Sequence, residues 1–275
     1  MNRHPSWAQF GETLPHNIIT HFEHDKWLIP FLLPKGFIIF GSAPKTGKTW
    51  LSEAIALAIS DGFPVGRTFS SWVQGLTIHY AEDDPGDLVS RIPVLTHYSP
   101  MPIENYYIAE NATQFSFEDQ EARDKLEALC ERAKPVLLVF DTARRFFSGD
   151  ENSSTDVAVI TNYLVGLYRD YGVNVILNHH LTGDDRKLRG STDFVGAAHY
   201  VANIKATKIH GCEIACRITP THTKAVRALE WSFGITAEQE DQRRYAVVAM
   251  DTATKLKYQQ KREQLDMEQL AIGDL

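Results

Sequence analysis

A short apolar strand that leads through a glycine-bearing loop into a helix is the feature that most limits how this chain can fold. Residues 37–40 read F-I-I-F and end at Gly41, and such a run suits a strand buried on both faces of a parallel sheet. Residues 48–60 follow with apolar side chains at helical spacing, among them Leu51 and Ile55. The sequence therefore predicts a layered fold of strands and helices.

Strand and helix patterns continue to alternate beyond this first unit. In order along the chain, the pattern predicts a strand at 77–81, a helix at 118–133, a strand at 136–140, a helix at 154–171 and a strand at 173–177. This alternation predicts an α/β fold with a mostly parallel, doubly wound sheet. The alternation then stops, and shorter pieces predict antiparallel strands on the edge of the sheet, at 200–209, 212–219, 226–233 and 244–250.

Composition and charge exclude several classes of protein. The chain has 275 residues, 43% of them hydrophobic, which excludes a disordered or collagen-like chain. Its three cysteines are too few for a disulfide framework. The net charge of −7 argues against a bulk nucleic-acid binder but leaves room for a local basic groove. The sequence lacks the pattern of a signal peptide or a membrane span, so we expect a soluble cytoplasmic protein with no membrane partner.

The loop after the first strand carries a phosphate-binding pattern. It reads S-A-P-K-T-G-K-T and resembles the Walker A motif, except that Ser42 stands where the first glycine is usual. Backbone N–H groups of such a loop cradle phosphate oxygens. We expect Lys48 to reach the terminal phosphates of ATP and the Thr49 hydroxyl to ligate Mg²⁺. The predicted nucleotide-binding residues are Ser42, Ala43, Pro44, Lys45, Thr46, Gly47, Lys48, Thr49 and Trp50.

Two further strands lead into carboxylates. Asp141 ends the run V-L-L-V-F-D, which has the Walker B form and predicts that Asp141 holds Mg²⁺ through water. A helix cap is the alternative role for Asp141. Glu82 follows the strand at 77–81 and is our candidate for the base that acts on the attacking water. The alternatives are that Asp83 is the base, or that Glu82, Asp83 and Asp84 form a solvated acidic loop.

The strand at 173–177 leads into Asn178, His179 and His180. A polar side chain at this point can hydrogen-bond the γ-phosphate and report its hydrolysis, and we assign this sensor role to His180. Adjacent side chains point apart in an extended chain, so a metal shared by the two histidines would have poor geometry. A structural histidine is the alternative.

Together these motifs resemble the RecA-like P-loop ATPases, in the branch of the plasmid RepA replicative helicase and related AAA-type ATPases of phages and plasmids. The resemblance runs from about Trp27 to about Lys224. It rests on W-L-I-P, A-P-K-T-G-K-T, Y-A-E-D-D-P, V-F-D-T-A-R-R-F followed by E-N-S, N-H-H and R-G-S, in that order. It implies a RecA-like ATPase domain over 36–254, preceded by a leader at 1–35 and followed by a C-terminal helix or tail at 255–275.

The resemblance also implies a homo-oligomeric ring, usually a hexamer, with ATP at the subunit interface. Arg189, which precedes Gly190 and Ser191, matches the family's arginine finger, a residue that acts on the neighbouring subunit's nucleotide. An ordinary basic loop residue is the alternative. Lys224 lies near the position of a second such cation, but Val226 stands where its companion arginine is usual.

Two loops would face the pore of such a ring. They span 143–155 and 182–193, and the second carries Arg186 and Lys187. Single-stranded DNA binding uses cations beside aromatic rings, and the first loop offers both, although phenylalanines directly after a strand are more often core. Its candidates for DNA contact are Arg144, Arg145, Phe146 and Phe147, and Arg145 has the nucleotide site as its alternative.

Three functions follow from these motifs. The first is an ATP-driven ring helicase or translocase of the RepA type on single-stranded DNA. The second is a recombination or repair ATPase that forms filaments on DNA. The third is a nucleotide-dependent regulatory ATPase without motor activity, because fold alone does not fix function.

Overall fold

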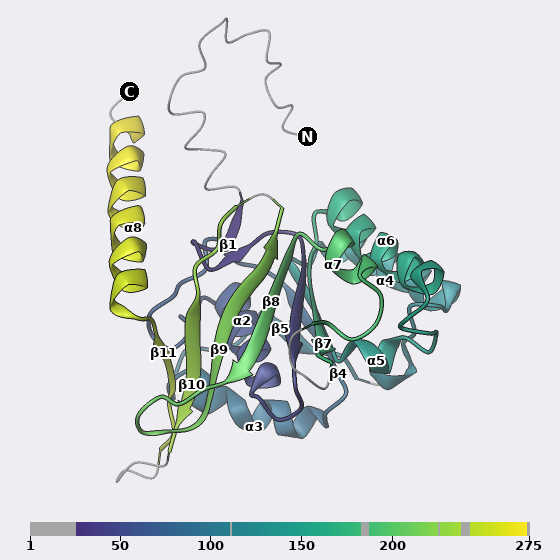
Figure 1. The fold of residues 1–275 in the computed structure, drawn as a ribbon, viewed down its shortest axis with the longest axis horizontal. Helices are drawn as coiled ribbons and strands as arrows, with labels where there is room; N and C mark the ends of the chain where they lie inside the picture. Colours follow the sequence, from purple (N-terminus) through teal and green to yellow (C-terminus); the bar gives the residue numbers. More distant parts are fainter. Residues whose placement is uncertain (1–25, 111, 183–186, 225, 238–242, 274–275) are drawn as a thin grey trace, which may run out of the picture.

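A large mixed sheet lies at the centre of the fold (Figure 1). The computed structural model describes residues 26–110, 112–182, 187–224, 226–237 and 243–273. Within these residues the sheet has nine strands, in the order β11 (Ala246–Ala249), β10 (Trp231–Thr236), β9 (Cys212–Thr223), β8 (Tyr200–Ala206), β3 (Phe37–Ser42), β7 (Asn174–His180), β6 (Leu137–Asp141), β4 (Thr77–Ala81) and β5 (Tyr106–Ile108).

The six strands from β8 to β5 pair in parallel, whereas β9, β10 and β11 are antiparallel. The predicted mostly parallel sheet with a C-terminal antiparallel edge is therefore confirmed. The prediction that residues 200–209 form an antiparallel edge strand is confirmed in part, because β8 pairs antiparallel with β9 but also parallel with β3, inside the sheet. The chain returns to the start of β3 before it enters β8, and the His199 N–H donates to the Phe37 carbonyl at 2.8 Å.

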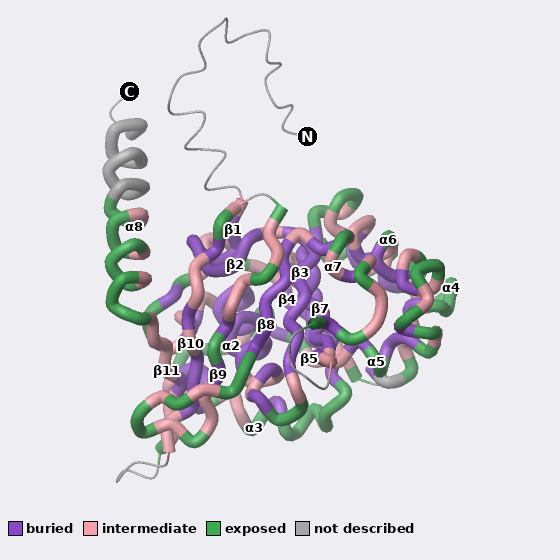
Figure 2. Tube along the Cα trace, in the orientation of Figure 1, coloured by how far each residue is buried: buried purple, intermediate pink, exposed green. Residues whose placement is uncertain are grey.

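Helices cover both faces of the sheet. One face packs against α2 (Lys48–Ser60) and α3 (Pro85–Leu95). The other face packs against α4 (Gln120–Ala133), α5 (Ala143–Phe146), α6 (Ser154–Tyr171) and α7 (Asp193–Ala197). A single turn, η2 (Ala112–Gln114), precedes α4, and α8 (Thr252–Gly273) follows the last strand. Figure 2 shows that α2 is buried like the central strands, whereas α3 and α4 bury only a few of their residues.

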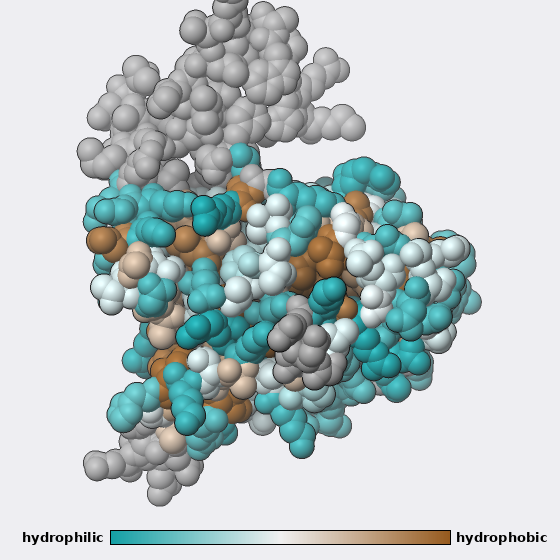
Figure 3. Space-filling model, viewed as in Figure 1, coloured by the Kyte–Doolittle hydropathy of each residue, from teal (hydrophilic) through white to brown (hydrophobic). Residues whose placement is uncertain are grey.

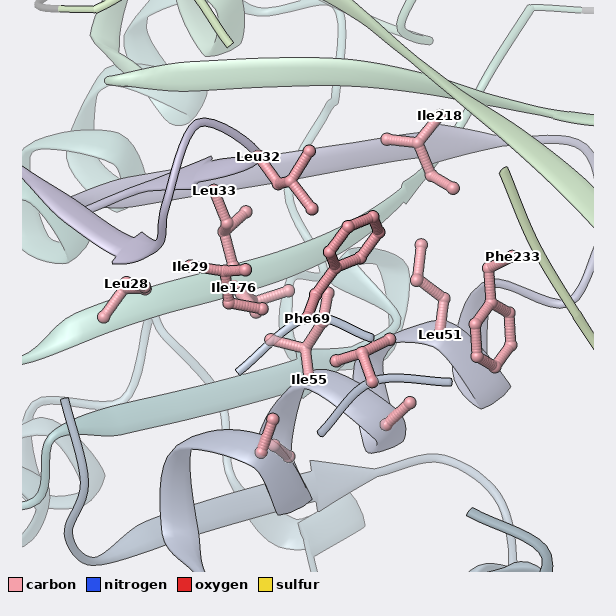
Figure 4. Close-up of a cluster of buried hydrophobic side chains, with 14 of the residues drawn as sticks. Leu28, Ile29, Leu32, Leu33, Leu51, Ile55, Phe69, Ile176, Ile218 and Phe233 are labelled. Carbon is pink, nitrogen blue, oxygen red and sulfur yellow. The ribbon is translucent and has the colours of Figure 1, made fainter. Parts of the chain in front are cut away.

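The larger core cluster lies on the α2 face (Figure 4). A small hairpin of β1 (Trp27–Ile29) and β2 (Leu33–Pro34) packs into it, together with Leu51 and Ile55 of α2. Tyr258 of α8 contacts the Phe69 ring at a centroid distance of 5.2 Å. The predicted leader is thus described only from Lys26, where it is part of the core, and its residues 1–25 lie outside the described residues.

The surface carries the polar residues that this core excludes. Figure 3 shows a face covered mainly by hydrophilic side chains, with small, separate hydrophobic areas. In the described part of the chain, no helix has both the length and the apolar character that crossing a membrane requires.

Candidate nucleotide site

The phosphate-binding loop joins the end of β3 to the start of α2. Lys45 and Gly47 take the left-handed backbone conformation, with φ of 61° and 89°, and the Thr46 hydroxyl closes the turn by donating to the Ala43 carbonyl at 3.0 Å. Ser42 is the last residue of β3 and lies in extended backbone. Glycine is therefore not needed at this position, which explains how the chain departs from the usual Walker A pattern without disturbing the loop.

The N-terminus of α2 is left free to bind an anion. Gly47 caps the helix without a side chain, so the first-turn N–H groups have no side-chain cap among the described residues. Free N–H groups and the positive end of the helix dipole favour phosphate. Pro44 and Lys45 are exposed, and Thr49 and Trp50 are half-buried beside them. The loop and the start of α2 therefore offer N–H groups to an anion, and the assignment of residues 42–50 to nucleotide binding stays a prediction.

Lys48 lies beneath this loop and is almost fully buried. Its Nζ donates to the His179 carbonyl at 3.3 Å. Burial lowers the pKa of Lys48, and the carboxylates of Asp141 and Glu82 oppose that shift. Lys48 is thus held at the strand tips. Its ammonium group can form charge-assisted hydrogen bonds with the phosphates of a nucleotide there.

The tip of β6 places Asp141 in the same region. Asp141 is 3% exposed, and its two carboxylate oxygens have no hydrogen-bond partner among the described residues. Buried polar atoms are normally paired, so this carboxylate fits a ligand that the protein itself does not supply. Thr49 and Asp141 would hold Mg²⁺ there, and the ion would neutralise charge on the phosphates. Both residues have the oxygen chemistry that Mg²⁺ prefers.

The three acids after β4 have different contacts. The Glu82 N–H donates to the Asp141 carbonyl at 2.6 Å, and its carboxylate accepts from the Thr142 hydroxyl at 3.2 Å. Asp84 caps α3 by accepting from the Gly86 N–H at 2.7 Å. Asp83 pairs instead with Arg91 of α3. Glu82 thus bonds to the Asp141–Thr142 segment, whereas Asp83 and Asp84 have their contacts with α3, and this favours Glu82 as the base.

The tip of β7 lies between β3 and β6. Asn178 faces α2, and its amide donates to the Ser52 hydroxyl at 2.8 Å. His179 packs against the Phe194 ring on the opposite face. His180 pairs in register with Ser42, and its Nδ1 has no partner among the described residues. Burial, and then the nearby Lys48, lower the pKa of His180, so a neutral imidazole is favoured at this tip. The sensor role of His180 stays a prediction.

The three remaining candidate cations have contacts within their own chain, and the Arg189 N–H donates to the His180 carbonyl at 3.0 Å. Arg189 is 63% exposed, and its Nε pairs with Glu151 of its own chain at 3.2 Å. The ammonium group of Lys224 donates to the Ala197 carbonyl at 2.7 Å. Arg145 is exposed at the end of the short helix α5. The roles of Arg189 and Lys224 toward a neighbouring nucleotide stay predictions, as does the role of Arg145 in DNA contact or in the nucleotide site.

The two loops predicted to face a pore differ in what they expose. Phe146 and Phe147 are buried in the core, so the proposed stacking of DNA bases on these two rings is wrong. The Phe146 ring packs against the rings of Phe115, Phe117 and Phe140. Arg144 remains exposed, as does Lys187. Arg186 lies outside the described residues.

The sequence did not predict a second set of side-chain contacts, which lies behind the site. Arg91 pairs with Asp83 at 2.9 Å and lies 3.9 Å from Glu53, which is fully buried on α2. Two guanidinium groups lie against the Trp50 ring, those of Arg91 at 5.4 Å and Arg244 at 5.5 Å from its centroid. A glutamate within an otherwise apolar helix face was the one visible signal in the sequence.

The P-loop, the buried carboxylate of Asp141 and Glu82 thus meet at the carboxyl ends of parallel strands, where open α/β sheets bind their ligands. Comparison with known families agrees with this arrangement. A model of the AAA domain matches residues 4–186, which is more than half of the chain. No curated protein matches the chain. Fold, site and family match lead to one conclusion: the chain belongs to the AAA domain family and has the architecture of a P-loop ATPase.

Proposed function

We propose that this protein is a Mg²⁺-dependent, ring-forming ATPase motor of the RepA type that acts on single-stranded DNA. The observation that carries the proposal is the meeting of Lys48, Asp141, Glu82 and His180 at the tips of four adjacent parallel strands. Lysine and helix N–H groups bind phosphate, Asp141 with Thr49 binds the metal, and Glu82 takes a proton from the attacking water. Mg²⁺ supplies charge neutralisation on the transferred phosphoryl group when it is bound.

The ring is supported by the position of Arg189. Its guanidinium group is more than half exposed and its partner Glu151 is buried, so the arginine lies at the surface of its own chain. An arginine that serves a nucleotide in trans must reach outward in this way, and such a residue raises hydrolysis rates about 10³–10⁵-fold.

A regulatory ATPase without motor activity is the second candidate. The burial of Phe146 and Phe147 favours it, because these rings were the aromatic part of the predicted DNA contact. The exposed cations Arg144 and Lys187 still allow a salt-sensitive contact with the DNA backbone inside a ring.

The two candidates are separated by measuring ATP hydrolysis with and without single-stranded DNA. The motor predicts stimulation by DNA that decreases as salt rises, and particles of ring mass in mass photometry with a non-hydrolysable ATP analogue. Lys48→Ala serves as the inactive reference, and Lys125→Ala, an exposed residue of α4, as the matched lysine control. Hydrolysis without any response to DNA would contradict the motor function and favour the regulatory ATPase.

If Arg189 acts on the nucleotide of a neighbouring subunit, two inactive variants should complement each other when they are mixed. Arg189→Ala and Glu82→Gln should each be nearly inactive alone, whereas a mixture of the two should recover part of the activity. Some interfaces in a mixed ring combine an intact Glu82 with an intact neighbouring Arg189, and only those interfaces hydrolyse ATP. The measurement is the ATPase rate across mixing ratios, with a peak expected between the pure variants. A rate that never exceeds either pure variant contradicts a role in trans.

A further inference from the structure

A buried carboxylate lies behind the nucleotide site without a close partner. The Glu53 side chain is 0% exposed, and neither of its oxygens has a hydrogen-bond partner among the described residues. Burying an ionised carboxylate is unfavourable unless a cation compensates the charge, so burial here favours the protonated carboxyl group. The nearest cation is Arg91, whose Nη1 lies 3.9 Å away. Glu53 thus gives Arg91 a contact on α2.

Arg91 connects three parts of the site. Its Nη2 donates to Asp83 at 2.9 Å, its Nη1 faces Glu53, and its guanidinium plane lies over the Trp50 ring at 5.4 Å. The side chain is only 15% exposed, so it is held inside this cluster. Arginine suits the position because its planar group can face two carboxylates and a ring at once.

The three partners are next to residues of the proposed chemistry. Asp83 directly follows Glu82, Trp50 directly follows Thr49, and Glu53 lies one turn further along α2. We propose that Arg91 is a positioning residue, which ties the Glu82 loop to α2 and so fixes the distance between the base and the phosphate-binding loop. This inference rests on the proposed ATPase function, and it concerns the geometry of Glu82 rather than contact with the nucleotide.

The physical reason is the sensitivity of proton transfer to geometry. Glu82 is exposed, and among the described residues its loop is otherwise held by the bonds of Glu82 with Asp141 and Thr142 and by the bonds of Asp84 with the first turn of α3. A misplacement of about 1 Å in a reacting group can cost about a hundredfold in rate. Loss of the Arg91 tie should therefore slow hydrolysis while the phosphate loop still binds nucleotide.

The test compares Arg91→Gln, Asp83→Asn and the double variant. Each single variant should lower kcat by about tenfold or more, with KM and the Kd of a fluorescent ADP analogue changed less than about threefold. The double variant should be no slower than the slower single variant, because both remove the same tie. Arg91→Lys should recover only part of the rate, since lysine cannot face both carboxylates. Arg169→Gln is the matched control, because Arg169 pairs with Asp170 on the distant α6.

Hydrogen exchange gives a readout that does not depend on activity. Amides of residues 82–84 should exchange faster in Arg91→Gln than in the wild type, while those of α6 stay unchanged. An inactive wild type would overturn the proposed function, and the exchange result would still decide the tie. Unchanged exchange, additive losses in kcat, or a loss confined to KM and Kd would overturn the proposal; the last result would mean that Arg91 contacts the nucleotide itself.

Discussion

Glu82→Gln should lower kcat for ATP hydrolysis by about 10²–10⁴-fold while the nucleotide still binds. Glutamine keeps the size of the side chain and can still accept from the Thr142 hydroxyl, so the loop should keep its shape. It cannot take a proton from water at neutral pH. The loss therefore falls on the chemical step, whereas the contacts of Lys48 and the P-loop with phosphate remain.

The measurement combines steady-state hydrolysis with nucleotide titration. Glu131→Gln, an exposed glutamate on α4, is the matched control and should hydrolyse ATP as the wild type does. Equal losses of binding and rate would show that the variant disturbs the site as a whole. A variant as fast as the wild type would remove Glu82 as the base, and Asp83→Asn would then be compared in the same assay.

Glu53→Gln should stabilise the nucleotide-free protein at alkaline pH and change little at pH 5. Burial raises the pKa of Glu53 from 4.5 to about 8, with Asp141 and Asp83 adding to the shift and Arg91 opposing it. The folded protein therefore holds a proton on Glu53 that the unfolded chain has lost. Stability from this group is fully present below pH 4.5 and is lost as the pH rises to about 8. Glutamine does not titrate, so the variant avoids this loss.

The measurement is chemical unfolding of both proteins at pH 5, 6.5 and 8.5. The stability difference in favour of Glu53→Gln should grow with pH by an amount on the order of a few kcal/mol. Glu121→Gln is the control, because Glu121 is exposed and pairs with Lys125 on the surface, where such pairs contribute about 0–1 kcal/mol. A difference that is constant across pH would mean that Glu53 is charged throughout, paired by Arg91.

Local patterns in the sequence predicted most individual elements. The helices at 48–60 and 154–171 and the strand at 77–81 have the predicted bounds, because each has a clear apolar period and ends at a recognisable signal. Asp119 and Ser153 cap α4 and α6, and such capping residues mark the start of a helix in the sequence. The short elements β5 and α5 were missed, since three or four residues give no period to read, and so was the 11-residue helix α3, which carries Pro93 inside it.

The features of the site also fall into two groups, those that the sequence located and those that only the structure shows. The residues of the phosphate loop are contiguous, so the motif alone located them. The direction of β8 and the burial of Phe146 depend on contacts with segments that are distant in the sequence. Local sequence patterns do not predict such contacts. The ties of Arg91 are of the same kind, because Glu53, Asp83 and Arg91 stand on different elements.

By itself the sequence determined an α/β fold with a phosphate loop between its first sheet strand and first helix, and with carboxylates at two other strand ends. These properties follow from residues within a few positions of each other, where periodicity and backbone chemistry decide the outcome. Only the tertiary structure decided that β7 lies between β3 and β6, that Arg189 pairs with Glu151, and that Glu53 is buried beside Arg91. These follow from packing between distant segments, whose contact energies exist only once the sheet has formed.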